Sequence, residues 1–242
     1  MRICAAQTRP IKGDIQGNIR NHTRLINEAV SLASDLIIFP ELSLTGYEPE
    51  IAASLAVFPD HNGLDEFQCM ADADHISIAV GVPTPANPIG TCISLVLFQP
   101  QTPRQVYSKQ FIHPDEEPYF IAANPTTDWT INNLRIAPAI CYEITVPQHA
   151  NNAFKRGVQM YVASVAKFVS GIDTAHHQMS AIAKKLAVPA LMTNCVGTCD
   201  NQQCGGASAC WNDNGELIGR LDGINEGILV YDTATQACIA RT

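Results

Sequence analysis

The sequence predicts an α/β domain in which helices and strands are mixed along the whole chain. Apolar strand-like runs alternate with segments of helical periodicity from one end to the other. Apolar residues make up 46% of the 242 residues, which is enough for a sizeable core, and no linker, repeat or low-complexity tract divides the chain. We therefore expect residues 1–242 to form a single domain.

The first half of the chain predicts five strands and one helix. The strand-like runs lie at residues 1–7, 35–40, 76–84, 90–98 and 103–109. After the first run, apolar residues recur with helical spacing from Ile15 to Ala33, and Asp14 is suited to cap that helix. The third and fourth runs are joined through the turn-rich segment PTPANPIG.

The second half repeats this pattern and ends in turns. Strand-like runs lie at residues 134–140, 159–164 and 189–196. Helices are expected at residues 147–156, where Pro147 suits the first turn, and at 175–187, where apolar residues form one stripe. Two turn dipeptides, Asn214-Gly215 and Asp222-Gly223, predict hairpins.

Charge and composition restrict the partners and the compartment. The chain has 15 basic and 23 acidic residues, a net charge of −8, and no run of Lys or Arg, so neither a nucleic acid nor an anionic membrane is an expected partner. No apolar stretch is long enough to span a bilayer, and the N-terminal apolar run is too short for a signal peptide. We expect a cytoplasmic protein. Because only 16% of residues are charged, much of the surface is expected to be neutral or covered by a partner.

The nine cysteines are best interpreted as free thiols in a reducing compartment, because a disulfide-stapled fold would be shorter and denser in cysteine. Cys195, Cys199, Cys204 and Cys210 lie close together in sequence, but no pair has the CxxC spacing of a zinc knuckle. Buried or incidental thiols are therefore favoured over a metal site. The nucleotide-binding motifs GxGxxG and GxxxxGK are absent, and no cofactor or metal is expected.

Three polar residues stand at the ends of apolar strand-like runs: Glu41, Lys109 and Cys141. In α/β proteins catalytic groups gather at strand ends, because the sheet fixes them while loops close around them. A cysteine nucleophile needs a proton acceptor and a cation nearby, and these residue types supply both. Taken singly, each has an ordinary alternative: a solvated turn carboxylate, a surface lysine and a small core thiol.

The sequences around these residues favour the catalytic interpretation. FPELSLTGYEP, YSKQFIHPDEEPYF and ICYEITVP, in this order, resemble the three signature blocks of the carbon–nitrogen hydrolase (nitrilase) superfamily, in its amidase-like branch. TNCVG, GGAS and DNGE further along resemble later segments of that family. The resemblance implies an αββα four-layer sandwich, catalytic roles for Glu41, Lys109 and Cys141, and pairing of chains through helices into a homodimer or larger assembly.

The resemblance also implies further site residues. A second catalytic glutamate lies between the lysine and the cysteine, and counting along the segment favours Glu116 over its neighbour Glu117. The backbone N–H of Tyr142 is expected to bind the oxyanion, and Tyr47 is expected to bind substrate. The implied reaction is hydrolysis of a small carboxamide through a cysteine thioester, with release of ammonia.

Some features leave the substrate open. The family often has Asp-x-Arg-Phe-Pro-Glu after its Cys-Tyr, whereas this chain has Thr145 and Gln148 in place of charged residues. A nitrile hydrolase, an N-carbamoyl amide hydrolase and a non-enzymatic binding protein of the same fold remain as alternatives. Pro138 lies within the strand that leads to the nucleophile, which indicates an edge or a bulge there.

Overall fold

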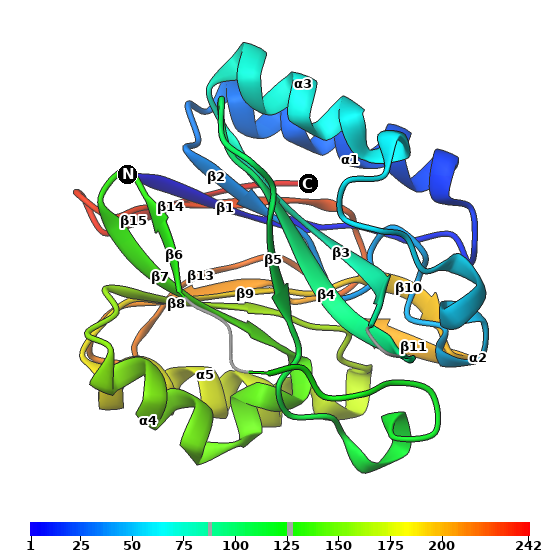
Figure 1. Ribbon diagram of the computed structural model, residues 1–242. Helices are drawn as coiled ribbons and strands as arrows, with labels where there is room; N and C mark the ends of the chain where they lie inside the picture. Colours follow the sequence, from blue (N-terminus) through cyan, green and yellow to red (C-terminus); the bar gives the residue numbers. More distant parts are fainter. Residues whose placement is uncertain (87–88, 125–127) are drawn as a thin grey trace.

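The computed structural model describes residues 1–86, 89–124 and 128–242, and its main elements are two mixed sheets with helices outside them (Figure 1). The strands of the first sheet are β1 (Arg2–Gln7), β2 (Leu36–Ile38), β3 (Ser77–Pro85), β4 (Thr91–Phe98), β5 (Gln105–Ser108), β14 (Gly227–Asp232) and β15 (Ala237–Arg241). The strands of the second sheet are β6 (Trp129–Ile131), β7 (Leu134–Ile140), β8 (Met160–Ser164), β9 (Ala190–Thr193), β12 (Ala209–Trp211) and β13 (Leu217–Arg220). The α-helices are α1 (Ile15–Ser31), α2 (Pro49–Ala52), α3 (Asp65–Asp74), α4 (Pro147–Lys155) and α5 (Ile172–Leu186). A separate hairpin is formed by β10 (Val196–Cys199) and β11 (Gln202–Gly205).

The elements form four layers, as expected. The strand order is β15-β14-β1-β2-β3-β4-β5 in the first sheet and β13-β12-β9-β8-β7-β6 in the second. Helices α1 and α3 cover the outer face of the first sheet, and α4 and α5 cover the outer face of the second (Figure 1). One apolar cluster joins the two sheets with α4 and α5, and another joins the first sheet with α1 and α3. The predicted αββα sandwich is confirmed.

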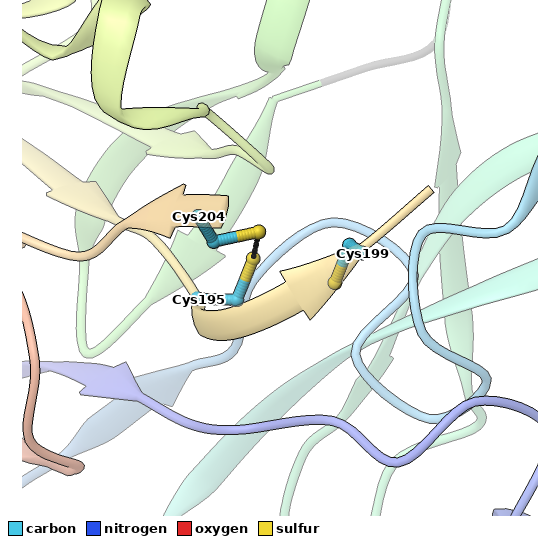
Figure 2. A group of neighbouring side chains, drawn as sticks. All are labelled: Cys195, Cys199 and Cys204. Atoms are coloured by element: carbon cyan, nitrogen blue, oxygen red, sulfur yellow. Dashed lines mark hydrogen bonds between the residues drawn. The ribbon is translucent and has the colours of Figure 1, made fainter. Parts of the chain in front are cut away.

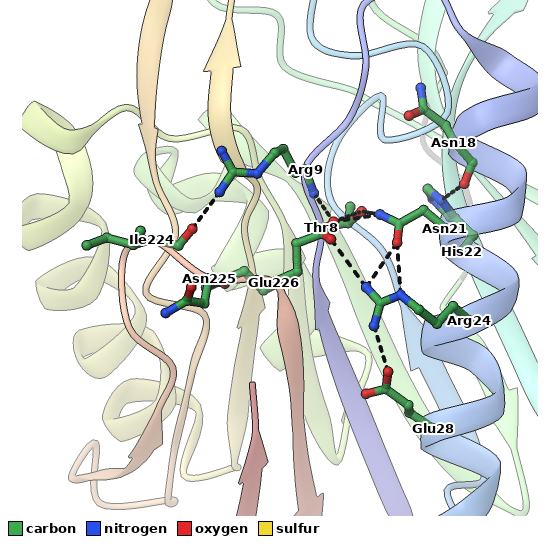
Figure 3. Close-up of polar contacts among 11 residues, drawn as sticks. Thr8, Arg9, Asn18, Asn21, His22, Arg24, Glu28, Ile224, Asn225 and Glu226 are labelled. Carbon is green, nitrogen blue, oxygen red and sulfur yellow. Dashed lines mark hydrogen bonds and ion pairs between the residues drawn. The ribbon is translucent and has the colours of Figure 1, made fainter.

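The first helix is fixed at its start and along one face. Oδ1 of Asp14 accepts a hydrogen bond from the Gly17 N–H at 2.9 Å, so the predicted cap is present. Glu226, just before β14, connects the segment after β1 to α1 (Figure 3). Its Oε1 accepts hydrogen bonds from the Arg9 N–H at 2.6 Å and from Nδ2 of Asn21 at 2.6 Å. Because Glu226 lies far along the chain from both, these bonds hold the C-terminal strands against the N-terminal elements.

The predicted elements are found with small shifts. The run at 189–196 divides into β9 and the start of β10, and helix α3 was not anticipated. The hairpin at Asn214-Gly215 is confirmed as β12–β13. The second expected hairpin is wrong, because Asp222-Gly223 connects β13 to β14, which belong to different sheets. In the PTPANPIG connection, residues 87–88 lie outside the described part of the chain.

Pro138 sits at a local edge within the second sheet. It pairs with Val162 of β8 in regular parallel register. On the other side β6 pairs only with residues 134–136, so the missing N–H of Pro138 has no strand beside it. The expected edge is therefore local to this half of β7.

One cysteine expectation is wrong. Cys210 in β12 and Cys238 in β15 are joined by a disulfide, which links the two sheets. The other seven cysteines, all within the described ranges, are free thiols, as expected. None of the helices in the described ranges has the length and apolarity needed to cross a membrane.

Candidate active site

Glu41, Lys109 and Cys141 come from three strand ends that meet between the sheets. Lys109 follows β5 directly, Cys141 follows β7 directly, and Glu41 lies in the turn after β2. Nζ of Lys109 donates to Oε1 of Glu41 at 2.8 Å. A Cβ on Gly81 of β3 would collide with the Pro40 carbonyl oxygen, so glycine is required for the Glu41 turn to lie against that strand.

The Glu41 carboxyl group is completely inside the protein. Burial raises its pKa, and the attraction of Lys109 opposes that rise without cancelling it. Oε2 of Glu41 accepts no hydrogen bond from the described residues, but the Cys141 thiol is near enough to act on the pKa of this carboxyl as a donor. Glu41 therefore has one oxygen held by Lys109 and one free to exchange a proton.

Lys109 is an ammonium without contact with solvent. Burial lowers its pKa, but the nearby negative charges outweigh this effect, and the net pKa lies above the ordinary value. Besides Glu41, its Nζ donates to Oε1 of Glu116 at 2.7 Å. The two carboxylates thus keep the lysine charged at any pH at which the protein would work.

Cys141 occupies a strained turn. Its φ of 45° lies in the left-handed region, which is uncommon for residues other than glycine, and it starts the short 3₁₀ helix η4 (Cys141–Thr145). Burial, followed by the charge of Glu41, raises the pKa of its thiol to about 11, with Lys167 and Lys109 acting in the opposite direction. The resting group is a thiol, so its attack on a substrate requires a base.

The structure distinguishes the two adjacent glutamates. Glu116 ends the short 3₁₀ helix η3 (Pro114–Glu116) and is only 2% exposed, while Glu117 is exposed. Besides Lys109, Oε1 of Glu116 receives the Tyr47 hydroxyl at 2.9 Å, and Oε2 receives the His113 N–H at 2.9 Å. Glu116 is thus brought to the cluster with Tyr47, and Glu117 is not.

A fifth buried residue of the candidate site, Glu143, was not predicted from the sequence. Its Oε2 accepts from the Ile140 N–H at 2.7 Å and from the Tyr107 hydroxyl at 2.7 Å, and its Oε1 accepts from the Gln110 N–H at 2.6 Å. It therefore links the segment after Lys109 to the turn that carries Cys141. Burial raises the pKa of Glu143 to about 7. The sequence alone contains one signal, a glutamate two positions after the candidate nucleophile.

The Glu143 contacts continue into a buried chain of hydrogen bonds. The Tyr107 hydroxyl lies 2.8 Å from Nε2 of His149, and Nδ1 of His149 lies 2.8 Å from the Tyr161 hydroxyl. Since Tyr107 donates to Glu143, Nε2 of His149 is the donor to Tyr107, and Nδ1 accepts from Tyr161. Burial lowers the pKa of His149 to about 4, consistent with this neutral ring.

Two of the four catalytic candidates, Cys141 and Glu116, line a cavity of about 540 Å³. Tyr47 and Tyr142 line the same cavity. The remaining wall combines charged and aromatic side chains, among them Lys167, Phe168, Glu50 and Asp200. A cavity of this size suits a small polar molecule.

The cavity itself contains no group of metal ligands among the described residues. One cluster of three cysteines elsewhere, Cys195, Cys199 and Cys204, has the side chains and spacing for a metal ion. The chemistry available in the cavity is instead that of a thiol beside a carboxyl group and an ammonium, an arrangement that suits acyl transfer.

The amino-acid sequence is similar to those of known proteins. A family model described as "Carbon-nitrogen hydrolase" matches residues 2–240. The glutamine-dependent NAD(+) synthetase of Synechocystis sp. is 26% identical over 260 residues, a match that covers 96% of this chain and 46% of that protein. The corresponding synthetase of Thermotoga maritima is 42% identical over 50 residues, covering 21% of this chain and 9% of that protein. The chain thus spans less than half the length of these curated relatives.

Some solved structures match this chain over nearly the whole length of both proteins. A structure of the amidase from Nesterenkonia sp. AN1 in complex with butyramide aligns with a TM-score of 0.88 at 21% identity, over 98% of this chain and 92% of that chain. Another structure of that amidase aligns with a TM-score of 0.86 at 22% identity, over 96% and 92% of the two chains. At this level of identity the likeness establishes a shared fold.

Proposed function

Because the chain belongs to the carbon–nitrogen hydrolase family, we propose that it is an amidase that hydrolyses a small carboxamide through a thioester on Cys141. The observation that carries the proposal is the placement of the Cys141 thiol beside the buried Glu41–Lys109 pair at a cavity. In this proposal water and the amide become a carboxylic acid and ammonia, and no cofactor takes part.

The first half of the reaction forms the thioester. Glu41 accepts the thiol proton, and the Cys141 sulphur attacks the amide carbon. The negative charge that develops on the amide oxygen is stabilised by Lys109 and by the backbone N–H of Tyr142. Glu41 then returns its proton to the departing nitrogen, the C–N bond breaks, and ammonia leaves.

The second half releases the acid. Glu41 removes a proton from water, the hydroxide attacks the thioester, and the C–S bond breaks with return of a proton to the sulphur. Glu116 holds Lys109 through the 2.7 Å ion pair and supports the position of the attacking water. The raised pKa of Glu41 suits a group that takes up and gives back a proton in each half.

Two kinds of amide are candidates for the substrate. A short aliphatic amide agrees with the cavity of about 540 Å³ and with the butyramide complex of the Nesterenkonia amidase. The side-chain amide of glutamine is the second candidate, because the Synechocystis relative is a glutamine-dependent enzyme whose match covers 96% of this chain. In the second case the chain would release ammonia for use by another domain or partner.

One assay separates these candidates. Ammonia release is measured with short aliphatic amides, glutamine, N-carbamoyl amino acids and nitriles, for the wild type and for Cys141→Ala. We expect release from an amide by the wild type alone. Release from nitriles only would replace the amidase by a nitrile hydrolase, and no release from any compound would favour a non-enzymatic role.

We also propose that two chains pair through α4 and α5. An apolar groove of about 220 Å³ lies between these helices, lined in part by Val146, Ala150 and Ile182. Phe154 of α4 adds a large apolar side chain that is 61% exposed. A small-molecule substrate, supported by the size of the cavity, and a cytoplasmic location, supported by the seven free cysteines, complete the proposal.

A further inference from the structure

Three buried cysteines lie together where the β10–β11 hairpin packs behind the cavity wall (Figure 2). The Sγ atoms of Cys195, Cys199 and Cys204 all lie within 4.8 Å of one another, and those of Cys195 and Cys204 are 3.1 Å apart. The three residues are 1%, 1% and 0% exposed, respectively. None of them has a part in the reaction proposed above.

The hairpin register brings these thiols together. Cys204 of β11 pairs with Gly197 of β10, and Cys195 and Cys199 lie two residues before and after that glycine. Residues two positions from a cross-strand partner are its diagonal neighbours, so one thiol faces two others from the opposite strand. Gly197 adds no side chain between them. Sequence spacing alone conceals this group, because it has no CxxC pair.

The surroundings leave the three thiols with few partners other than one another. Ala166, Phe168 and Tyr47 pack against them. Sγ of Cys195 is 3.9 Å from Oδ1 of Asn194, but that oxygen already accepts the Lys167 N–H at 2.8 Å. Among the described residues no histidine or carboxylate joins the group. Thiols form only weak hydrogen bonds, so the three sulphurs gain little from one another. Binding of all three to a metal ion would therefore be chemically favourable.

We propose that Cys195, Cys199 and Cys204 together bind one thiophilic d¹⁰ metal ion, Zn²⁺ or Cu⁺, through their sulphurs. Three metal–sulphur bonds form, the thiol protons pass to solvent, and no electron is transferred. With metal–sulphur bonds of about 2.3 Å, sulphurs around one ion lie roughly 4 Å apart, within the spread of this cluster. Cu⁺ suits three soft ligands, whereas Zn²⁺ generally takes a fourth, such as water.

The test is a metal titration of the full-length, fully reduced protein. Cys141→Ala serves as the background, so that the nucleophile does not compete. Zn²⁺ and Cu⁺ are titrated separately against a chromophoric chelator, and X-ray absorption measures the ligands of the bound ion. We expect one ion per chain with three sulphur neighbours at about 2.3 Å. A fourth, lighter ligand identifies the zinc form, and three-coordination identifies the copper form.

Variants locate the site. In the same background, Cys199→Ser and, separately, Cys195→Ser should weaken binding by roughly 100-fold or more, because each removes one of three ligands. Cys69→Ser, at an exposed cysteine outside the cluster, should bind as tightly as the background protein. Circular dichroism checks that each variant is folded. The proposal is overturned by absence of stoichiometric binding, by equal affinity in Cys199→Ser, or by a Cys195–Cys204 disulfide that persists in the reduced protein.

Discussion

The Lys109 ammonium lies 2.8 Å from Oε1 of Glu41, and both side chains are 0% exposed. A buried ion pair of this kind is a weak source of stability, because desolvation of both charges offsets their attraction. The contact of Lys109 with Glu116, which lines the cavity together with Cys141, instead indicates a catalytic use. The negative charge of Glu116 adds to the rise in the pKa of Glu41. Glu41, with its raised pKa and one unbonded oxygen, is therefore suited to accept the thiol proton and to return it.

The adjacent glutamates provide a matched pair for mutagenesis. Glu116→Gln keeps the shape and removes the charge that faces Lys109, so we expect kcat to fall by roughly 100-fold or more. Glu117→Gln changes an exposed side chain and should alter stability by less than about 0.5 kcal/mol, with kcat unchanged. Steady-state kinetics on the best amide of the panel measures both. The reverse pattern would remove Glu116 from the mechanism.

Glu143 should act by positioning the nucleophile turn. Glu143→Gln replaces one acceptor oxygen by a donor that faces N–H or O–H groups, so we expect kcat to fall by roughly tenfold or more. Tyr107→Phe removes only one of the three donors and should cost less. Kinetics combined with thermal unfolding separates this role from general destabilisation. A Glu143→Gln variant with normal kcat would show that the turn is held by other contacts.

Acid should destabilise the protein through a buried histidine of helix α1. Burial lowers the pKa of His22 to about 3, and its ring nitrogens contact the Asn18 carbonyl and the Ser43 hydroxyl. The folded state therefore binds fewer protons than the unfolded state between about pH 6.5 and 3, so stability falls as pH falls through this window. Urea unfolding at pH 7 and pH 4.5 should show a smaller loss in His22→Gln than in the wild type. An equal loss in both proteins would assign the acid sensitivity to other groups.

Pairing of chains can be tested at the α4 surface. Phe154→Glu places a charge in the proposed interface and should convert the dimer into a 26 kDa monomer in light scattering at micromolar concentration. Phe58 is 64% exposed and lies outside α4 and α5, so Phe58→Glu is the control and should remain dimeric. A wild type that is itself monomeric would contradict the proposed interface.

Local patterns in the sequence predict much of this molecule. The apolar runs before Glu41, Lys109 and Cys141 are sufficient to predict strands, and polar residues at strand ends are sufficient to suggest a shared site. The sandwich itself followed from the resemblance of three motif blocks to a known family. Counting along one of these blocks favoured Glu116 over Glu117 as the second catalytic glutamate.

Features that depend on distant contacts were not predictable. The donors to Glu143 include Tyr107 and Gln110, more than 30 positions away in the chain, so the sequence around Cys141 gives no sign of them. The disulfide joins strands of different sheets. The spacing of Cys210 and Cys238 along the chain does not show that they lie close together in space. The turn at Asp222-Gly223 was recognisable, but a turn dipeptide does not determine which sheet the next strand joins.

In the proposed mechanism Cys141 carries the acyl group, and intact-protein mass spectrometry can detect that group. The enzyme is mixed with a slowly hydrolysed amide, quenched in acid and weighed, and the labelled peptide is then sequenced. We expect one acyl group per chain on Cys141, none in Cys141→Ala, and no ammonia release by that variant although it remains folded. An acyl group on another residue, or wild-type turnover by Cys141→Ala, would contradict the mechanism.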